Sequence, residues 1–229
     1  MELTRKLLKK EEVLRYLGYQ GTEIPPHTER LIESCILETL KLVRPSYLYR
    51  RYPIRQSAEG ILVEGTTLCM SGEDIRRHLE GCAEIYLVCA TVGAFVDKQI
   101  RLKMVTEPAA GVVLDSCGSV AVEQVIEAAE REIEQEVEAE GKRITWRFSP
   151  GYGDLPLKLQ QELADTLDLH RRLGVSVSED MLLAPSKSVT AIIGVMETAW
   201  QEEGEKGSKC ERCQNRERCN FYQREGLKK

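Results

Sequence analysis

The sequence predicts an α+β domain, because segments with the apolar spacing of helices alternate with short β-branched and aromatic runs. The helical spacing is clearest after Pro25-Pro26, where apolar residues recur every three or four positions until Pro45 ends the pattern. The strand pattern is clearest at 85–90, a continuous apolar run that is typical of a strand covered on both faces. The length of 229 residues fits one domain, or one domain with an appendage.

Six helices are expected from apolar periodicity and from residues that begin or end helices. They cover 11–17, 26 to Pro45, 71 to near Gly81, 93–105, 106–141 and 154–174. In the helix expected from 71, the residues Ser71-Gly72-Glu73-Asp74 have the spacing of a capping box, with Asp in place of Glu. In the last, Asp154 is expected to cap the first turn. The helix expected over 106–141 is rich in glutamate after 123, which predicts a solvated acidic face beside a buried stripe.

Strands are expected where β-branched and aromatic runs are bounded by Gly and Pro, at 47–54, 60–69, 85–90, 144–148, 175–177 and 189–195. The polar stretch 204–209 is rich in Gly and Lys and is expected to be a linker. The sequence is therefore divided into a domain at 1–200 and a linker with a cysteine-rich tail at 201–229.

Composition narrows the class of protein. Hydrophobic residues make up 42% and charged residues 30%, which is the balance of a chain that buries a real core. The formal charge of -5 and the lack of a long basic run argue against a nucleic-acid partner. The N-terminal residues are charged where a signal peptide needs an apolar stretch, and no apolar run is long enough to span a membrane. A cytoplasmic protein without a membrane partner is expected.

The most informative segment is Arg147-Phe148-Ser149-Pro150-Gly151-Tyr152, at the end of an expected strand. It offers a guanidinium fork, a glycine that lets the backbone approach a ligand, and an aromatic face. These groups match a small zwitterion that carries a flat heterocycle. The alternative is a plain turn between a strand and a helix, with Arg147 in a salt bridge and Tyr152 packed.

These residues resemble the Arg-x-x-x-Gly-Tyr motif of the activation (reactivation) domain of cobalamin-dependent methionine synthase. Similar residues follow at Leu173-Gly174-Val175, Glu179, Met181, Pro185 and Ser188-Val189. Upstream, 90–93 and 114–123 resemble small stand-alone proteins of that family. The resemblance covers about 1–197 and is strongest over 145–195. It implies a twisted, mainly antiparallel sheet flanked by helices.

The resemblance also implies a function. An activation domain presents S-adenosylmethionine so that inactive cob(II)alamin, carried by the partner enzyme, is reduced by one electron and methylated. The partners implied are a corrinoid-dependent methionine synthase, or a related methyltransferase, and an electron donor. The sulfonium methyl already has a good leaving group, so the protein needs only to position it. No catalytic residue is expected, and the role is that of an accessory methyl donor.

Site residues follow from the motif position by position. Arg147 is implied to bind the ligand carboxylate, Gly151 to allow close backbone approach, and Tyr152 to lie against the nucleoside, with Ser149 and Pro150 completing the turn. Glu123 is a candidate for the ligand ammonium, and its alternative is an exposed helix glutamate. Asp115 is a second acidic candidate. The family's tyrosine-containing strand after Ser-Val is missing here, which leaves open whether a partner completes the pocket.

A second set of candidate ligands is Cys210, Cys213 and Cys219, spaced C-x₂-C-x₅-C among arginines that favour thiolates. They could hold an iron–sulfur cluster or zinc, with Cys69, Cys82 or Cys89 as a distant fourth ligand, or remain unmetallated or form a disulfide. The rival function is accordingly a metal-dependent or iron–sulfur redox or interaction module of the same fold that binds no S-adenosylmethionine.

Overall fold

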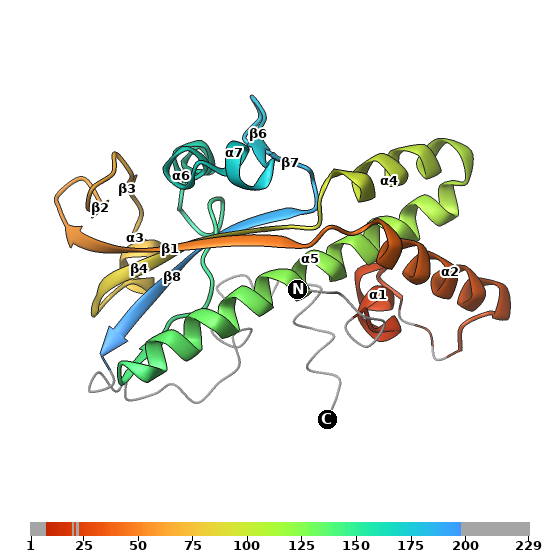
Figure 1. Cartoon of the computed structure of the whole chain (residues 1–229), viewed down its shortest axis with the longest axis horizontal. Coiled ribbons are helices and arrows are strands. Elements are labelled where there is room, and N and C mark those ends of the chain that lie inside the picture. Colours follow the sequence, from red (N-terminus) through yellow and green to blue (C-terminus); the bar gives the residue numbers. More distant parts are fainter. Residues whose placement is uncertain (1–7, 20, 22, 198–229) are drawn as a thin grey trace.

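The computed structural model describes residues 8–19, 21 and 23–197, and these form an α+β fold built on a six-stranded sheet (Figure 1). The strand order is β3-β2-β1-β4-β8-β5, and each neighbouring pair is antiparallel. The strands are β1 (Ser46–Gln56), β2 (Ile61–Val63), β3 (Cys69–Met70), β4 (Cys82–Thr91), β5 (Lys142–Ile144) and β8 (Ser188–Glu197). The predicted antiparallel α+β fold is confirmed. A separate two-stranded sheet pairs β6 (Ser176–Val177) with β7 (Leu183–Ala184).

The helices follow the predicted segments closely, with one exception. They are α1 (Lys10–Tyr16), α2 (Pro26–Leu42), α3 (Glu73–His78), α4 (Ala94–Thr106), α5 (Pro108–Ala139), α6 (Leu159–Leu167) and α7 (Leu169–Leu173). The exception is the helix expected over 154–174, which is two helices. Asp168 separates them in the left-handed conformation, with φ 53°.

β4 lies at the centre of the core because its side chains alternate between two apolar layers. Tyr86, Val88 and Ala90 pack in the layer that contains α5, whereas Ile85 and Leu87 pack in the layer that contains α6. All five side chains are buried. The continuous apolar run is therefore a strand covered on both faces, as predicted.

α5 covers one face of the sheet, with α1 and α2 packed beside it, while α6 and α7 lie on the opposite face (Figure 1). Its buried stripe is the predicted one, and Val125, Ile126, Ala129, Ile133 and Val137 are fully buried. The spacing of three or four residues places them on one side of the helix.

The acidic side of α5 is not simply solvated, because several of its glutamates bind the sheet. The hydrogen-bonded pairs are Tyr47 with Glu132, Tyr49 with Glu136, Tyr86 with Glu136, and Arg51 with Glu140. The hydrogen bond to the Glu132 carboxylate, followed by burial, raises the pKa of Tyr47 to about 12. The glutamates thus fix how α5 lies on the sheet, which periodicity alone did not predict.

α5 is long and apolar enough to cross a membrane, and no other helix in the described part of the chain is. However, 67% of its apolar 18-residue stretch is buried inside the fold. A core helix beneath a sheet meets the same criterion.

Three strand predictions need correction. The run at 60–69 forms two short paired strands, β2 and β3, because residues 64–68 turn between them. The strand expected over 144–148 is regular only in β5, and Phe148 makes an isolated bridge to Ile192. β7 was not predicted, since its two residues are too few to show a pattern.

Two capping predictions were also wrong. The N-cap of α3 is Gly72, and its side-chain cap comes from Asp154, which lies about 80 residues away in the sequence. α6 begins at Leu159, so Asp154 does not cap the helix that follows it. The carboxylate that sequence reasoning assigned to a local helix instead joins two distant segments.

The α5–sheet interface should dominate the stability of the domain. Ile133→Ala removes buried methyl groups from a fully enclosed site, and we expect it to lower the free energy of unfolding by about 2–5 kcal/mol. Val105 is 83% exposed, so Val105→Ala should change the free energy of unfolding by less than about 0.5 kcal/mol. Urea unfolding followed by circular dichroism measures both. Equal effects would contradict this account of the core.

Candidate functional site

The motif segment lies along the edge of β8, between β5 and α6. Phe148 exchanges two backbone hydrogen bonds with Ile192, at 2.9 and 2.7 Å. Next to it, the Ser149 hydroxyl donates to the Thr190 carbonyl at 2.8 Å. These bonds anchor the beginning of the motif to a long central strand, so the residues that follow start from a fixed position.

Residues 149–155 form the turn that the sequence predicted. The Tyr152 N–H donates to the Ser149 carbonyl at 3.0 Å, and the Gly151 N–H donates to the Leu155 carbonyl at 2.9 Å. Gly151 has φ 88°, a conformation that favours glycine. A Cβ there would lie 3.3 Å from Leu157 Cδ1. Pro150 is buried, whereas Gly151 and Tyr152 are exposed.

Arg147 points to α5 and meets two carboxylates. Its Nη2 lies 3.2 Å from Glu123 Oε2, and its Nε lies 3.1 Å from Glu130 Oε2. The Arg147 side chain is 21% exposed and that of Glu130 is 13% exposed. The structure places Glu123 against Arg147 in a salt bridge, which is the contact that the alternative interpretation expected for Arg147. That Arg147 and Glu123 hold a ligand stays a prediction.

Sequence reasoning missed Glu130 and Tyr16. Glu130 lies seven residues after Glu123, two turns along the same helix face, so helical spacing could have identified it. Tyr16 of α1 is close enough for the charges of Glu123 and Tyr152 to act on it, and burial, followed by Glu123, raises its pKa. Its proximity depends on how α1 packs on α5, which no local pattern shows.

Tyr152 presents the most exposed aromatic ring of the motif. The side chain is 59% exposed, and its ring meets Phe148 edge to face with 6.0 Å between centroids. Phe148 in turn packs on His78 of α3, at 4.9 Å. Phe148 thus supports the Tyr152 ring through an edge contact while the residue remains open to solvent, which suits stacking against a flat ligand.

His78 is the buried support beneath the motif. Its Nε2 lies 3.0 Å from Thr145 Oγ1, and its ring contacts Trp146 with 4.7 Å between centroids. Burial lowers the pKa of His78 to about 4. The imidazole is therefore neutral at neutral pH.

Asp115, the other acidic candidate, belongs to a different cluster. Its carboxylate lies 2.8 Å from Lys187 Nζ, which also donates to Ser119 Oγ at 3.0 Å. Asp115 precedes Glu123 by eight residues, which is about 12 Å along the helix axis. The structure does not bring it into the Arg147 cluster.

The candidate metal ligands Cys210, Cys213 and Cys219 lie outside the described residues. Within the described part of the chain, no group of three His, Cys, Asp or Glu side chains could hold a metal ion. Of the suggested fourth ligands, burial raises the pKa of Cys82 and of Cys89 to about 12. A buried thiol that resists ionisation is a poor metal ligand.

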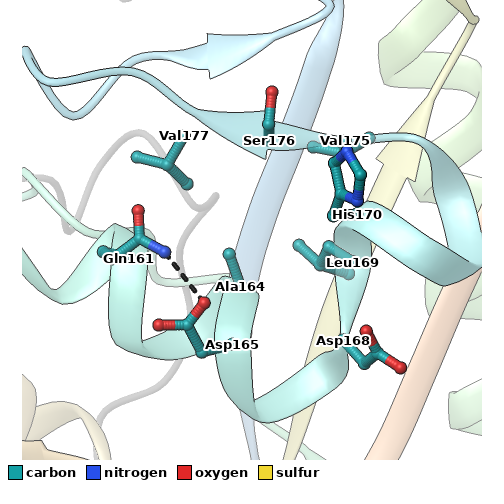
Figure 2. A pocket seen from close by; sticks show the side chains of 9 residues that line it. All are labelled: Gln161, Ala164, Asp165, Asp168, Leu169, His170, Val175, Ser176 and Val177. Atoms are coloured by element: carbon teal, nitrogen blue, oxygen red, sulfur yellow. Dashed lines mark hydrogen bonds between the residues drawn. The ribbon is translucent and has the colours of Figure 1, made fainter.

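A hollow of about 350 Å³ lies elsewhere, between α6, α7 and β6 (Figure 2). Its lining residues are Gln161, Ala164, Asp165, Asp168, Leu169, His170, Val175, Ser176 and Val177. Gln161 donates a hydrogen bond of 2.8 Å to Asp165 one turn along α6, on the side of this hollow (Figure 2). None of the site residues predicted from the sequence lines this hollow.

The fold defines the class as an α+β domain with the architecture of a methionine synthase reactivation domain. A solved structure described as the MetH reactivation domain bound to AdoHcy is similar, with a TM-score of 0.62. The alignment covers 85% of this chain and 77% of that one, at 13% sequence identity. No family model and no curated protein matches the sequence. At this identity the similarity shows the fold alone.

The neutral His78 predicts a loss of stability in acid. The unfolded chain binds a proton near pH 6.5, but the folded chain binds it only near pH 4. Stability is therefore complete above about pH 6.5 and falls as the pH drops towards 4, by up to about 3 kcal/mol. Urea midpoints from pH 4 to 7.5 measure this. His78→Gln should flatten the profile, whereas substitution of the exposed His170 by Gln should leave it unchanged. A profile that His78→Gln does not alter would contradict the assignment.

Proposed function

We propose that this protein is a stand-alone reactivation protein that binds S-adenosylmethionine at Arg147, Glu123 and Tyr152. It would present the methyl group to a cobalamin carried by a partner, a methionine synthase or another corrinoid-dependent methyltransferase. The observation that carries the proposal is the ion cluster of Arg147, Glu123 and Glu130 beside an exposed Tyr152. Support comes from the sequence motif and from a similar fold whose solved structure holds AdoHcy.

The ion cluster matches the amino-acid end of such a ligand by charge. A ligand carboxylate accepts two parallel N–H bonds from the Arg147 guanidinium, in exchange for one of the glutamates that it now holds. The released glutamate then accepts from the ligand ammonium. This exchange keeps two carboxylates on the guanidinium and gives the released glutamate a new cation, so no charge of the cluster is left unpaired.

The nucleoside end is assigned to Tyr152, whose exposed ring can stack on an adenine. Transfer of the sulfonium methyl returns its bonding electron pair to sulfur and leaves S-adenosylhomocysteine. The chain therefore has no proton to move during transfer, and its task is to hold the methyl in line with the acceptor. The cobalamin, once reduced by an electron from a separate donor, supplies the nucleophile.

Arg147→Ala should raise the dissociation constant for S-adenosylmethionine by about tenfold or more, because a charge-assisted bidentate contact typically contributes about 1.5–3 kcal/mol. Calorimetric titration of anaerobically purified protein measures it, with and without a partner loaded with cob(II)alamin. Arg171→Ala is the matched control, since Arg171 pairs with Asp168 on the surface. An unchanged constant in Arg147→Ala would remove this residue from the site.

The titration with the partner tests whether a partner completes the pocket. If the partner completes the pocket, the affinity measured with it should exceed the affinity of the isolated chain. If neither condition gives saturable binding of the wild-type chain, the reactivation proposal is wrong and the rival redox or interaction role gains support.

The cysteine tail supports a second proposal, carried by spacing alone: Cys210, Cys213 and Cys219 hold an iron–sulfur cluster or zinc. Anaerobic protein should contain iron with sulfide, or zinc, and Cys213→Ser should remove most of it. Cys117→Ser is the control, because Cys117 is buried among apolar residues and burial raises its pKa to about 12. Metal-free wild-type protein would rule out the metal site.

A further inference from the structure

The turn that carries Tyr152 is joined to α3 by a reciprocal pair of aspartates. The Asp154 carboxylate accepts from the backbone N–H groups of Glu73 and Asp74, at 2.6 and 3.1 Å. In return, Asp74 Oδ2 accepts from the backbone N–H of Asp154 at 3.2 Å. We call these three bonds the aspartate clasp. They connect segments about 80 residues apart in the sequence.

The backbone on both sides of the clasp leaves room for nothing larger than glycine. A Cβ on Gly72 would lie 2.5 Å from Asp154 Oδ1, and a Cβ on Gly153 would collide with Asp74 Oδ2. Both glycines have positive φ, 138° and 53°. Each aspartate thus binds directly against a glycine of the other segment, which is a close approach that a larger side chain would prevent.

The α3 side of the clasp is packed against the core. Ile75 and Leu79 are fully buried, and His78 packs on Phe148 at 4.9 Å. The beginning of the turn is held separately, by the Ser149 hydroxyl on the Thr190 carbonyl of β8. The turn is therefore fixed at both ends by different parts of the fold, with Tyr152 between the two anchors.

The Tyr152 side chain makes few contacts of its own with the described part of the fold. Its side chain is 59% exposed and its ring meets Phe148 only at an edge. The placement of the ring therefore depends on the backbone of the turn, which the clasp holds two residues later. An aromatic ring that is already in place binds a flat ligand without first losing conformational entropy.

We propose that Asp74 and Asp154 are positioning residues for the nucleoside end of S-adenosylmethionine and act through Tyr152. This inference rests on the proposed function. It assigns the two ends of the ligand to different supports: the amino-acid end to the Arg147 cluster on α5, and the nucleoside end to a turn that α3 holds.

The first experiment is a double-mutant cycle on S-adenosylmethionine binding. Asp154→Ala and Tyr152→Ala should each raise the dissociation constant, by about tenfold for the tyrosine. If the aspartate acts through the tyrosine, the double variant should bind no more weakly than Tyr152→Ala alone. Asp154→Asn keeps one acceptor oxygen and should recover part of the affinity. Asp165→Ala is the control, since the Asp165 carboxylate accepts only from Gln161 on α6 in the hydrogen bonds described.

The second experiment needs no ligand. Amide hydrogen exchange should speed up in Asp154→Ala over 149–156 and 73–76, while α5 stays as protected as in the wild type. If exchange is faster throughout the chain, or is no faster in the turn than in the wild type, the clasp does not hold the turn. Either result would overturn the proposal.

The two experiments separate the possible failures. Wild-type protein that binds S-adenosylmethionine, with Asp154→Ala binding equally well, would overturn the positioning role and leave the proposed function standing. Additive losses in the double variant would likewise show that the aspartate does not act through Tyr152. Wild-type protein that binds no S-adenosylmethionine would overturn the proposed function and this role together, whatever the exchange data show about the turn.

Discussion

The contact between α5 and the sheet is the interaction on which the rest of the structure depends. Its buried stripe, including Ile126 and Ile133, forms the core layer on one side of β4. Its polar side supplies Glu132 and Glu136 to tyrosines of the sheet, and Glu123 and Glu130 to Arg147. One helix therefore provides both the packing of the domain and the charged part of the candidate site.

This arrangement makes the ion cluster partly a structural feature. Removing a guanidinium that two carboxylates face leaves uncompensated charge, which is costly where solvent is partly excluded. A ligand that brings its own carboxylate and ammonium avoids that cost, because it exchanges partners within the cluster. The observed salt bridge is thus compatible with a binding role. It also disfavours ligands that carry only one of the two charges.

Local patterns predicted most of the fold, and three of the failures share one cause. Apolar periodicity located α2, α4 and α5, and the run at 85–90 located β4, because burial acts on neighbouring residues. Asp154 was assigned to the wrong helix, and Glu130 and Tyr16 were missed. Each of these contacts joins residues that only the packed fold brings together. In the site, the motif predicted the turn and Gly151, but not what supports them.

The candidate site lies where two layers of the fold meet at the edge of β8. Arg147 points to α5 in one layer, whereas Phe148 and the turn contact α3 in the other. A ligand that reaches from the ion cluster to Tyr152 would therefore contact both layers. Because β5 pairs only with 195–197 of β8, short backbone contacts from the motif segment cover the rest of this edge. The motif segment thus occupies the position of a further strand beside Ile192 and Gly194.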